Sequence, residues 1–133
     1  SFSSNDFIIS ARFKLEKSNE KNIKHKKKIA SDGRIKTQPL KYRSAGSVFK
    51  NPNSMLAAGF LIDKSGLKGT VCGDAEISTH HANFFINHGA AKAEDIAHLI
   101  KLSRMSIFER FGIMLDLEIK TIGFKNKELF PYD

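Results

Sequence analysis

The chain has 133 residues, of which 41% are hydrophobic and 10% aromatic, and this composition predicts one globular domain with a modest core rather than a disordered chain. No apolar run approaches the roughly 20 residues that a membrane-spanning helix requires, and the single cysteine excludes an internal disulfide and fits a reducing, cytoplasmic setting. The formal net charge of +8 has two explanations, an anionic ligand or partner, or a lysine-rich surface that is simply solvated.

The first third of the chain predicts a strand followed by a helix. Phe7 to Leu15 alternates apolar and polar residues after a short apolar start, which is the pattern of a strand. Asn19-Glu20 opens a helix that we expect to bury Ile23 and Ala30 and to end near Asp32-Gly33.

Much of the positive charge falls in this predicted helix. Its basic side chains indicate either a solvated helix face or a surface for nucleic acid or another polyanion. No aromatic residue is interleaved among them for base stacking, and almost all are lysine, so nucleic acid is not the expected partner. The residues are Lys21, Lys24, Lys26, Lys27 and Lys28 in the predicted helix, with Arg34 and Lys36 just after its predicted end.

The centre of the chain predicts a connection and a short helix. Gly33 to Lys50 contains Pro39 and reads as a loop-rich connection. Ser54 is placed to cap a helix that runs to Asp63 and stops at Gly66.

The last half predicts three strands and one long helix. Val71 to Ser78, Ala82 to Asn87 and Leu115 to Ile122 are candidate strands, and Ala93 to Phe111 places its apolar residues on one helical face. Because strands and helices follow no regular βαβ order, we expect an α+β fold with helices packed on a mainly antiparallel sheet.

The segment Arg43 to Pro52 carries the clearest chemical signal. Its Ser-Ala-Gly-Ser turn places the hydroxyl of Ser47 on tight backbone, where it can give or take a proton. Lys50 and Asn51 follow directly and are suited to an anionic, polyhydroxylated ligand. The alternative is an ordinary polar turn that leads into an edge segment.

Four further motifs follow this serine segment, and together the five resemble the UDP-N-acetylenolpyruvylglucosamine reductase (MurB) family over residues 34–124. In chain order they are Ala57–Asp63 with Ser65–Gly69, Gly73–Ser78, His81–Asn87, and Phe111–Ile119 with Ile122-Gly123. Each motif is weak by itself, and the specificity lies in their shared order.

The resemblance implies a domain organisation and an activity. Residues 1–36 would be the closing strand and helix of an FAD-binding domain whose remainder is missing, 37–124 the substrate-binding C-terminal domain, and 125–133 a tail. A separate or preceding chain segment would then complete the flavin site. The family is an FAD- and NADPH-dependent oxidoreductase that reduces the enolpyruvyl double bond of its UDP-sugar substrate to make UDP-N-acetylmuramate for peptidoglycan.

The resemblance also implies roles for single residues. Ser47 matches the serine that donates a proton to the enolate, and Glu118 matches the glutamate that assists it. Asn51, with Lys50 beside it, matches a substrate contact, and Arg34 matches an arginine that meets the flavin. His81 stands where some members carry a glutamine or histidine that contacts substrate, although it is equally suited to a hydrogen-bonded structural role.

Other classes of site and function were weighed. No metal site is expected, because His80 and His81 are adjacent on an extended chain and would point to opposite faces. Ser47 lacks the second glycine of a hydrolase elbow. The remaining alternatives are a basic, non-enzymatic α+β module that binds nucleic acid or another polyanion, and a nonfunctional remnant of a longer gene.

Overall fold

The computed structural model describes residues 7–125 and Leu129. Its internal contacts divide the chain into two units, Ser1–Asp32 and Gly33–Asp133. Each unit is described by itself.

The first unit does not contain the predicted strand. Residues 7–15 have no regular secondary structure, and apolar side chains such as Phe7, Ile9 and Leu15 are exposed. A strand needs hydrogen bonds from a neighbouring strand, and none of the described residues pairs with this segment. The prediction from alternation was therefore wrong.

Helix α1 (Glu20–Thr37) begins where the sequence predicts but ends later. The Oδ1 atom of Asn19 accepts a hydrogen bond from the N–H of Asn22 at 2.8 Å, a normal N-terminal cap. The predicted end at Gly33 is wrong, because that glycine has no positive φ and the helix continues until the approach of Pro39. No residue of α1 is buried, so the predicted inward face of Ile23 and Ala30 is also wrong.

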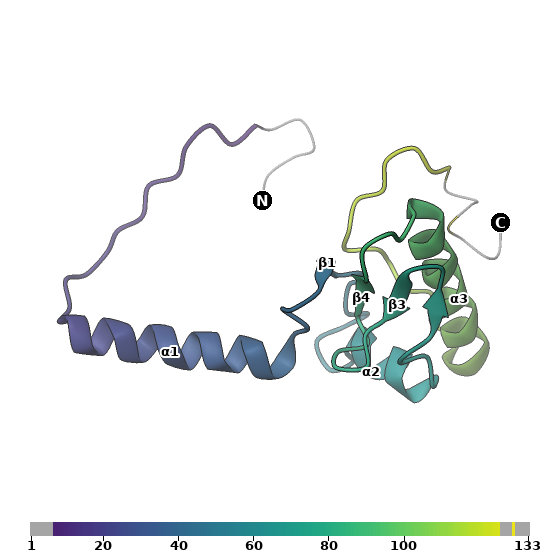
Figure 1. The fold of residues 1–133 in the computed structure, drawn as a ribbon, viewed down its shortest axis with the longest axis horizontal. Helices are drawn as coiled ribbons and strands as arrows, with labels where there is room; N and C mark the ends of the chain where they lie inside the picture. The colour runs from purple at the N-terminus through teal and green to yellow at the C-terminus, as the bar shows by residue number, and fades with distance from the viewer. Residues whose placement is uncertain (1–6, 126–128, 130–133) are drawn as a thin grey trace. The chain divides into compact units, whose positions relative to one another are not determined.

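The second unit contains a four-stranded antiparallel sheet and two further helices (Figure 1). The strands lie in the order β1-β4-β3-β2, and α3 packs against β2, β3 and α2. This arrangement confirms the predicted α+β class. The elements are β1 (Arg43–Ser47), α2 (Ala58–Lys64), β2 (Val71–Cys72), β3 (Ala75–Ile77), β4 (Phe84–Asn87) and α3 (Ala93–Phe111).

Two predicted strands differ from the structure. The segment Val71 to Ser78 is not one strand but the β2–β3 hairpin, because Gly73 turns the chain with a φ of +54°. A Cβ atom at Gly73 would also lie 2.4 Å from Oδ2 of Asp95, so a larger residue there would displace that carboxylate. Leu115 to Ile122 forms only a single β-bridge, between Leu117 and Phe49.

Both helices of the second unit end as predicted, and one begins differently. α2 starts at Ala58 rather than at a cap from Ser54, and it ends before Gly66, whose N–H donates to the carbonyl of Asp63 at 2.9 Å. α3 has the predicted bounds and closes the core with Leu99, Ile100 and Ile107.

A buried arginine connects α3 to the segment that follows it. Arg104 is 1% exposed. Its Nε donates to the carbonyl of Leu115 at 2.9 Å, and its Nη1 donates to the carbonyl of Leu129 at 2.7 Å. Burial lowers the pKa of Arg104, and the charge of Asp116 offsets part of this effect. Lys125 and Leu129 are the described residues of the predicted tail; residues 126–128 and 130–133 lie outside the described part.

In the part of the chain that the structure describes, no helix is both long and apolar enough to cross a membrane. No group of three or more His, Cys, Asp or Glu side chains among residues 7–125 and Leu129 is arranged to hold a metal ion.

Candidate functional site

A β-bulge at the end of β1 determines the direction of Ser47. Ser44 pairs with Ile86 and Ser47 with Phe84, so three steps along β1 match two steps along β4. The extra residue is accommodated by Gly46, which has a φ of +87°. Since side chains alternate between the two faces of a strand, one inserted residue moves Ser47 to the face that a regular strand would not give it.

Replacing Gly46 by alanine tests this bulge. A Cβ atom would meet nothing within 4 Å, so the expected loss of about 1–2 kcal/mol in the free energy of unfolding comes from backbone strain alone. Urea denaturation measures it. The control is Gly33→Ala, which lies within α1 with the same open space and should not lower stability. Equal stability of the two variants would contradict the assigned strain.

Immediately after the bulge, the side chain of Asn83 binds both backbone groups of one residue, Phe49. Its Oδ1 accepts from the N–H of Phe49 at 2.9 Å, and its Nδ2 donates to the carbonyl of Phe49 at 2.8 Å. The backbone carbonyl of Asn83 also accepts from the N–H of Val48 at 2.8 Å. Asn83 is 4% exposed, and these bonds account for its burial as a polar residue.

The neutral ring of His81 is held in one tautomer. Its Nδ1 accepts the backbone N–H of Asn83 at 3.3 Å, so the proton of the neutral ring lies on Nε2. Burial is the main reason that the pKa of His81 lies below the ordinary 6.5; a hydrogen bond of its own backbone raises it in part, and His80 and Lys68 lower it further. Helix α2 packs closely against this ring, since a Cβ atom at Gly59 would lie 3.3 Å from Cε1 of His81.

This lowered pKa predicts how stability depends on pH. Between the folded pKa of His81 and 6.5, the unfolded chain binds more protons than the folded one, so stability rises with pH in that window. The contribution is complete above pH 6.5 and is lost as the pH falls through 6.5 towards the folded pKa. Urea denaturation on both sides of pH 6.5 measures it, and His81→Gln should remove this part of the dependence. An unchanged profile in His81→Gln would refute the assignment.

Asn51 connects the serine segment to α2. Its Oδ1 accepts the N–H of Ala58 at 3.0 Å, which satisfies one of the free amides in the first turn of the helix. This bond replaces the cap that the sequence assigned to Ser54. The amide nitrogen of Asn51 remains for a ligand, since no described residue bonds to it.

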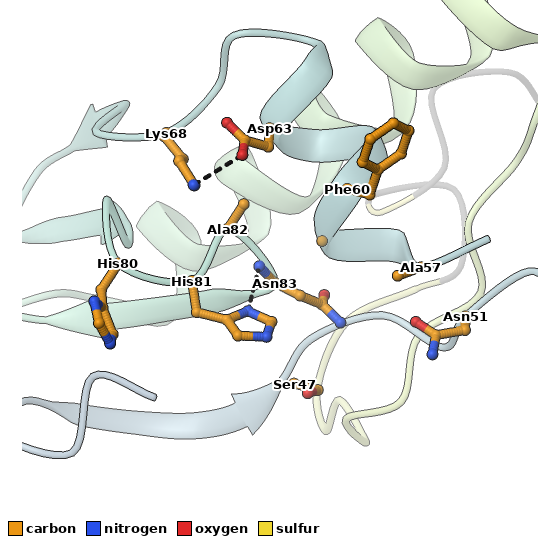
Figure 2. Close-up of a pocket in the computed structure, with 11 residues that line it drawn as sticks. Ser47, Asn51, Ala57, Phe60, Asp63, Lys68, His80, His81, Ala82 and Asn83 are labelled. Carbon is orange, nitrogen blue, oxygen red and sulfur yellow. Dashed lines mark hydrogen bonds and ion pairs between the residues drawn. The ribbon is translucent and has the colours of Figure 1, made fainter. Parts of the chain in front are cut away.

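These side chains meet in one cleft of about 350 Å³ (Figure 2). In Figure 2 the ring of His81 and the carboxamide of Asn83 lie between α2 and the serine segment. An ion pair joins Lys68 Nζ to Asp63 Oδ2 at 2.9 Å on the lining of the same cleft. The lining residues are Ser47, Asn51, Ala57, Gly59, Phe60, Asp63, Lys68, His80, His81, Ala82 and Asn83.

Ser47 also lines a second depression, of about 580 Å³, together with Arg34. Leu40, Tyr42 and Phe84 give this depression apolar walls. Ser47 therefore lies where two hollows meet, one containing Asn51 and His81 and the other Arg34.

Two predicted site residues lie outside both linings. The N–H of Glu118 donates to the carbonyl of Val48 at 2.8 Å, so its backbone lies beside the serine segment, but its side chain is exposed. The N–H of Lys50 donates to the carbonyl of Asp116 at 2.9 Å, and its side chain is also exposed. The structure brings both residues near Ser47 through the backbone, without placing either side chain in the cleft.

Sequence reasoning missed Asn83, Lys68 and Asp63 as members of the cleft. Asn83 had a visible signal, because it is a polar residue inside the apolar run Ala82 to Ile86 and a buried amide must find partners. Lys68 and Asp63 had none, since only the fold brings them to the wall opposite Ser47.

Comparison with known proteins shows which family the chain resembles. Residues 38–122 match the family model of the UDP-N-acetylenolpyruvoylglucosamine reductase C-terminal domain. The chain belongs to this family. It is 47% identical over 118 residues to the UDP-N-acetylenolpyruvoylglucosamine reductase of Synechococcus sp. (strain CC9605), and 48% identical over 120 residues to that of Caldicellulosiruptor bescii.

The reductases in these comparisons are longer than the chain. The alignments cover 88% and 90% of this chain but only 39% and 35% of the two relatives. The crystal structure of UDP-N-acetylenolpyruvylglucosamine reductase (MurB) from Thermus caldophilus matches with a TM-score of 0.67 and 38% identity, over 82% of this chain and 38% of that one. The chain is thus similar to somewhat more than a third of each reductase.

Proposed function

We propose that this chain is the C-terminal, substrate-holding part of an FAD- and NADPH-dependent reductase that converts UDP-N-acetylenolpyruvylglucosamine to UDP-N-acetylmuramate. The observation that carries the proposal is the position of Ser47 between two hollows, since a proton donor for this reaction must reach a substrate that also meets the flavin. Family membership and the names of the relatives support the reaction.

The depression with Arg34 suits one edge of a flavin. Its side chains offer one cation beside the apolar walls of Leu40, Tyr42 and Phe84, which fits a flat, partly polar ring. FAD, when bound, would supply the hydride that it receives from NADPH. The rest of the cofactor would be held by the remainder of an FAD-binding domain, which we place in the part of the reductase that these 133 residues do not cover.

The chain's own residues would hold the substrate and deliver the proton. Hydride addition to the enolpyruvyl double bond leaves an enolate on the carboxyl side. The carbon next to the carboxyl group must then gain a proton. Ser47 Oγ would give that proton, and the resulting alkoxide would be reprotonated from solvent. An enolate is a strong base, so a weak acid suffices if it is well placed. Glu118 would assist from the paired segment, whose backbone is bonded to Val48.

His81 and Asn51 would orient the sugar nucleotide. The neutral ring of His81 offers its Nε2–H, and Asn51 offers its free amide nitrogen, so both present donors to acceptor oxygens of the ligand. Lys50, exposed beside Asn51, would add positive charge near the anionic diphosphate.

A titration of the chain with UDP-N-acetylglucosamine tests the proposal. NMR chemical shifts that saturate and concentrate on Ser47, Asn51 and His81 are the expected result. N-acetylglucosamine without the nucleotide is the control ligand and should bind much more weakly. A folded sample whose shifts are absent or scattered over the surface would contradict the assignment of the cleft.

The exposure of α1 favours a second candidate function, binding of a polyanion. Every residue of this lysine-rich helix is exposed, and the ion pair between Lys24 and Glu20 lies fully at the surface. If α1 binds single-stranded nucleic acid, affinity should fall with salt by a log–log slope of about −0.7 per phosphate contact. A flat dependence, or unchanged binding after replacement of Lys24 and Lys28 by glutamine, would exclude this candidate.

A further inference from the structure

We propose that Asn83 is a positioning residue that fixes the orientation of Ser47 in the cleft. The meaning of this role for catalysis rests on the proposed function, but the role itself is a property of the free chain. The argument begins with the end of the β1–β4 ladder, where Ser47 pairs with Phe84. Beyond that pair the strand has no further partner residue in β4, which begins at Phe84.

Asn83 extends the ladder with its side chain. In an antiparallel ladder, every second residue of a strand is bonded to its partner through both its N–H and its carbonyl. The carboxamide of Asn83 provides the matching acceptor and donor for Phe49, at 2.9 and 2.8 Å. Its backbone carbonyl binds the N–H of Val48 at 2.8 Å. One residue therefore makes three hydrogen bonds to the backbone of the two residues that follow Ser47.

The position of these bonds is what makes them matter for Ser47. On one side the serine follows Gly46, which adopts a positive φ and, because it has no Cβ atom, restrains the backbone little. On the other side, Val48 and Phe49 are both bonded to Asn83, so this residue fixes the chain that directly follows the serine and its pair with Phe84. The side chains of Val48 and Phe49 are each 1% exposed, so their burial retains the segment in the core even when the carboxamide is removed.

The same residue also defines the facing wall. The backbone N–H of Asn83 binds Nδ1 of His81 at 3.3 Å, so Ser47 and His81 are both held relative to one residue (Figure 2). A side-chain substitution removes the two bonds to Phe49 and keeps the backbone bonds of Asn83 to Val48 and His81. A change at Ser47 with an unchanged His81 ring would therefore distinguish this role from a general loss of structure.

The test compares Asn83→Ala with the wild-type chain, without ligand, by NMR. Three-bond couplings should show one dominant χ1 rotamer of Ser47 in the wild type and rotamer averaging in Asn83→Ala. The ring nitrogen shifts of His81 should keep the Nε2–H pattern in both. In the wild type, a scalar coupling across the hydrogen bond from Phe49 N–H to the Asn83 carboxamide should be present.

Asn87→Ala is the matched control. Asn87 stands at the other end of β4, and its Oδ1 accepts the N–H groups of Gly89 at 2.7 Å and Ala91 at 3.1 Å, so its loss also removes an asparagine that binds two backbone amides. The Ser47 couplings should be unchanged in this variant. If Asn83→Ala does not fold, Asn83→Asp replaces it, since this side chain keeps the acceptor for Phe49 N–H and loses only the donor.

Either of two results would overturn the proposal: a folded Asn83 variant with wild-type Ser47 couplings, or a wild-type chain without the coupling between Phe49 and Asn83. Neither depends on ligand binding, so failure here is distinct from failure of the UDP-N-acetylglucosamine titration. In a complete reductase, Asn83→Ala should lower kcat for product formation by about 10–100-fold with little change in KM, as expected when a reacting group is displaced by about 1 Å.

Discussion

Ser47→Ala should abolish most product formation and leave the reduction of FAD by NADPH unchanged. The substitution removes one hydroxyl from the meeting point of the two hollows and leaves the backbone of the bulge intact. Because loss of a positioned general acid costs about 10²–10⁴-fold in rate, the oxidative half-reaction should slow by that factor. The measurement is stopped-flow absorbance of the flavin in a complete reductase, first with NADPH and then with the enolpyruvyl substrate.

The control for this prediction is Ser54→Ala. Ser54 is an exposed serine a few residues further along the chain and lines neither hollow, so both half-reactions should proceed at the wild-type rate. Loss of both half-reactions in Ser47→Ala would mean that the serine maintains structure or cofactor binding and is not the proton donor.

Arg104→Met should destabilise the fold more than any surface substitution. Methionine fills a similar length but leaves the carbonyls of Leu115 and Leu129 without the donors that the guanidinium supplies, and each lost bond from a charged donor costs about 1.5–3 kcal/mol. The ring of Phe49 also loses a cation 5.9 Å from its centre. We expect the free energy of unfolding to fall by about 3–5 kcal/mol, measured by urea denaturation.

Arg110→Met provides the comparison within the same helix. Arg110 is an exposed arginine in the last turn of α3, and its replacement should change stability by no more than about 0.5 kcal/mol. If Arg104→Met proved as mild as Arg110→Met, the hydrogen bonds of Arg104 would contribute little beyond the cost of burying its charge.

The sequence predicted elements best where a local pattern and the tertiary environment agree. α3 has the predicted bounds because a long apolar face, acidic residues in its first turn and a glycine stop all act together. The serine segment was recognised for its tight backbone, and Gly46 does adopt a positive φ. The structure also brings Ser47, Asn51 and His81 to one cleft, while their catalytic and binding roles stay predictions.

The failures share a physical cause, which is that strand formation depends on partners that local alternation cannot show. Residues 7–15 and Leu115 to Ile122 both alternate, but the first finds no strand to pair with in the described chain and the second forms one bridge. Burial of Arg104 was equally invisible, because its environment is created by the carbonyls of residues 11 and 25 positions away.

The bulge in β1 has a consequence for which changes of length the protein can tolerate. Deleting Ala45 would remove the bulge and leave Ser44 and Ser47 two regular steps apart, so Gly46 would have to adopt an extended strand conformation and the backbone that leads into Ser47 would change, without removing any residue of the cleft that contains Asn51 and His81. By contrast, the exposed turn at residues 53–55 lies outside the sheet and can gain or lose a residue without shifting any strand. Natural variation in chain length should therefore accumulate after the serine segment and be absent within it.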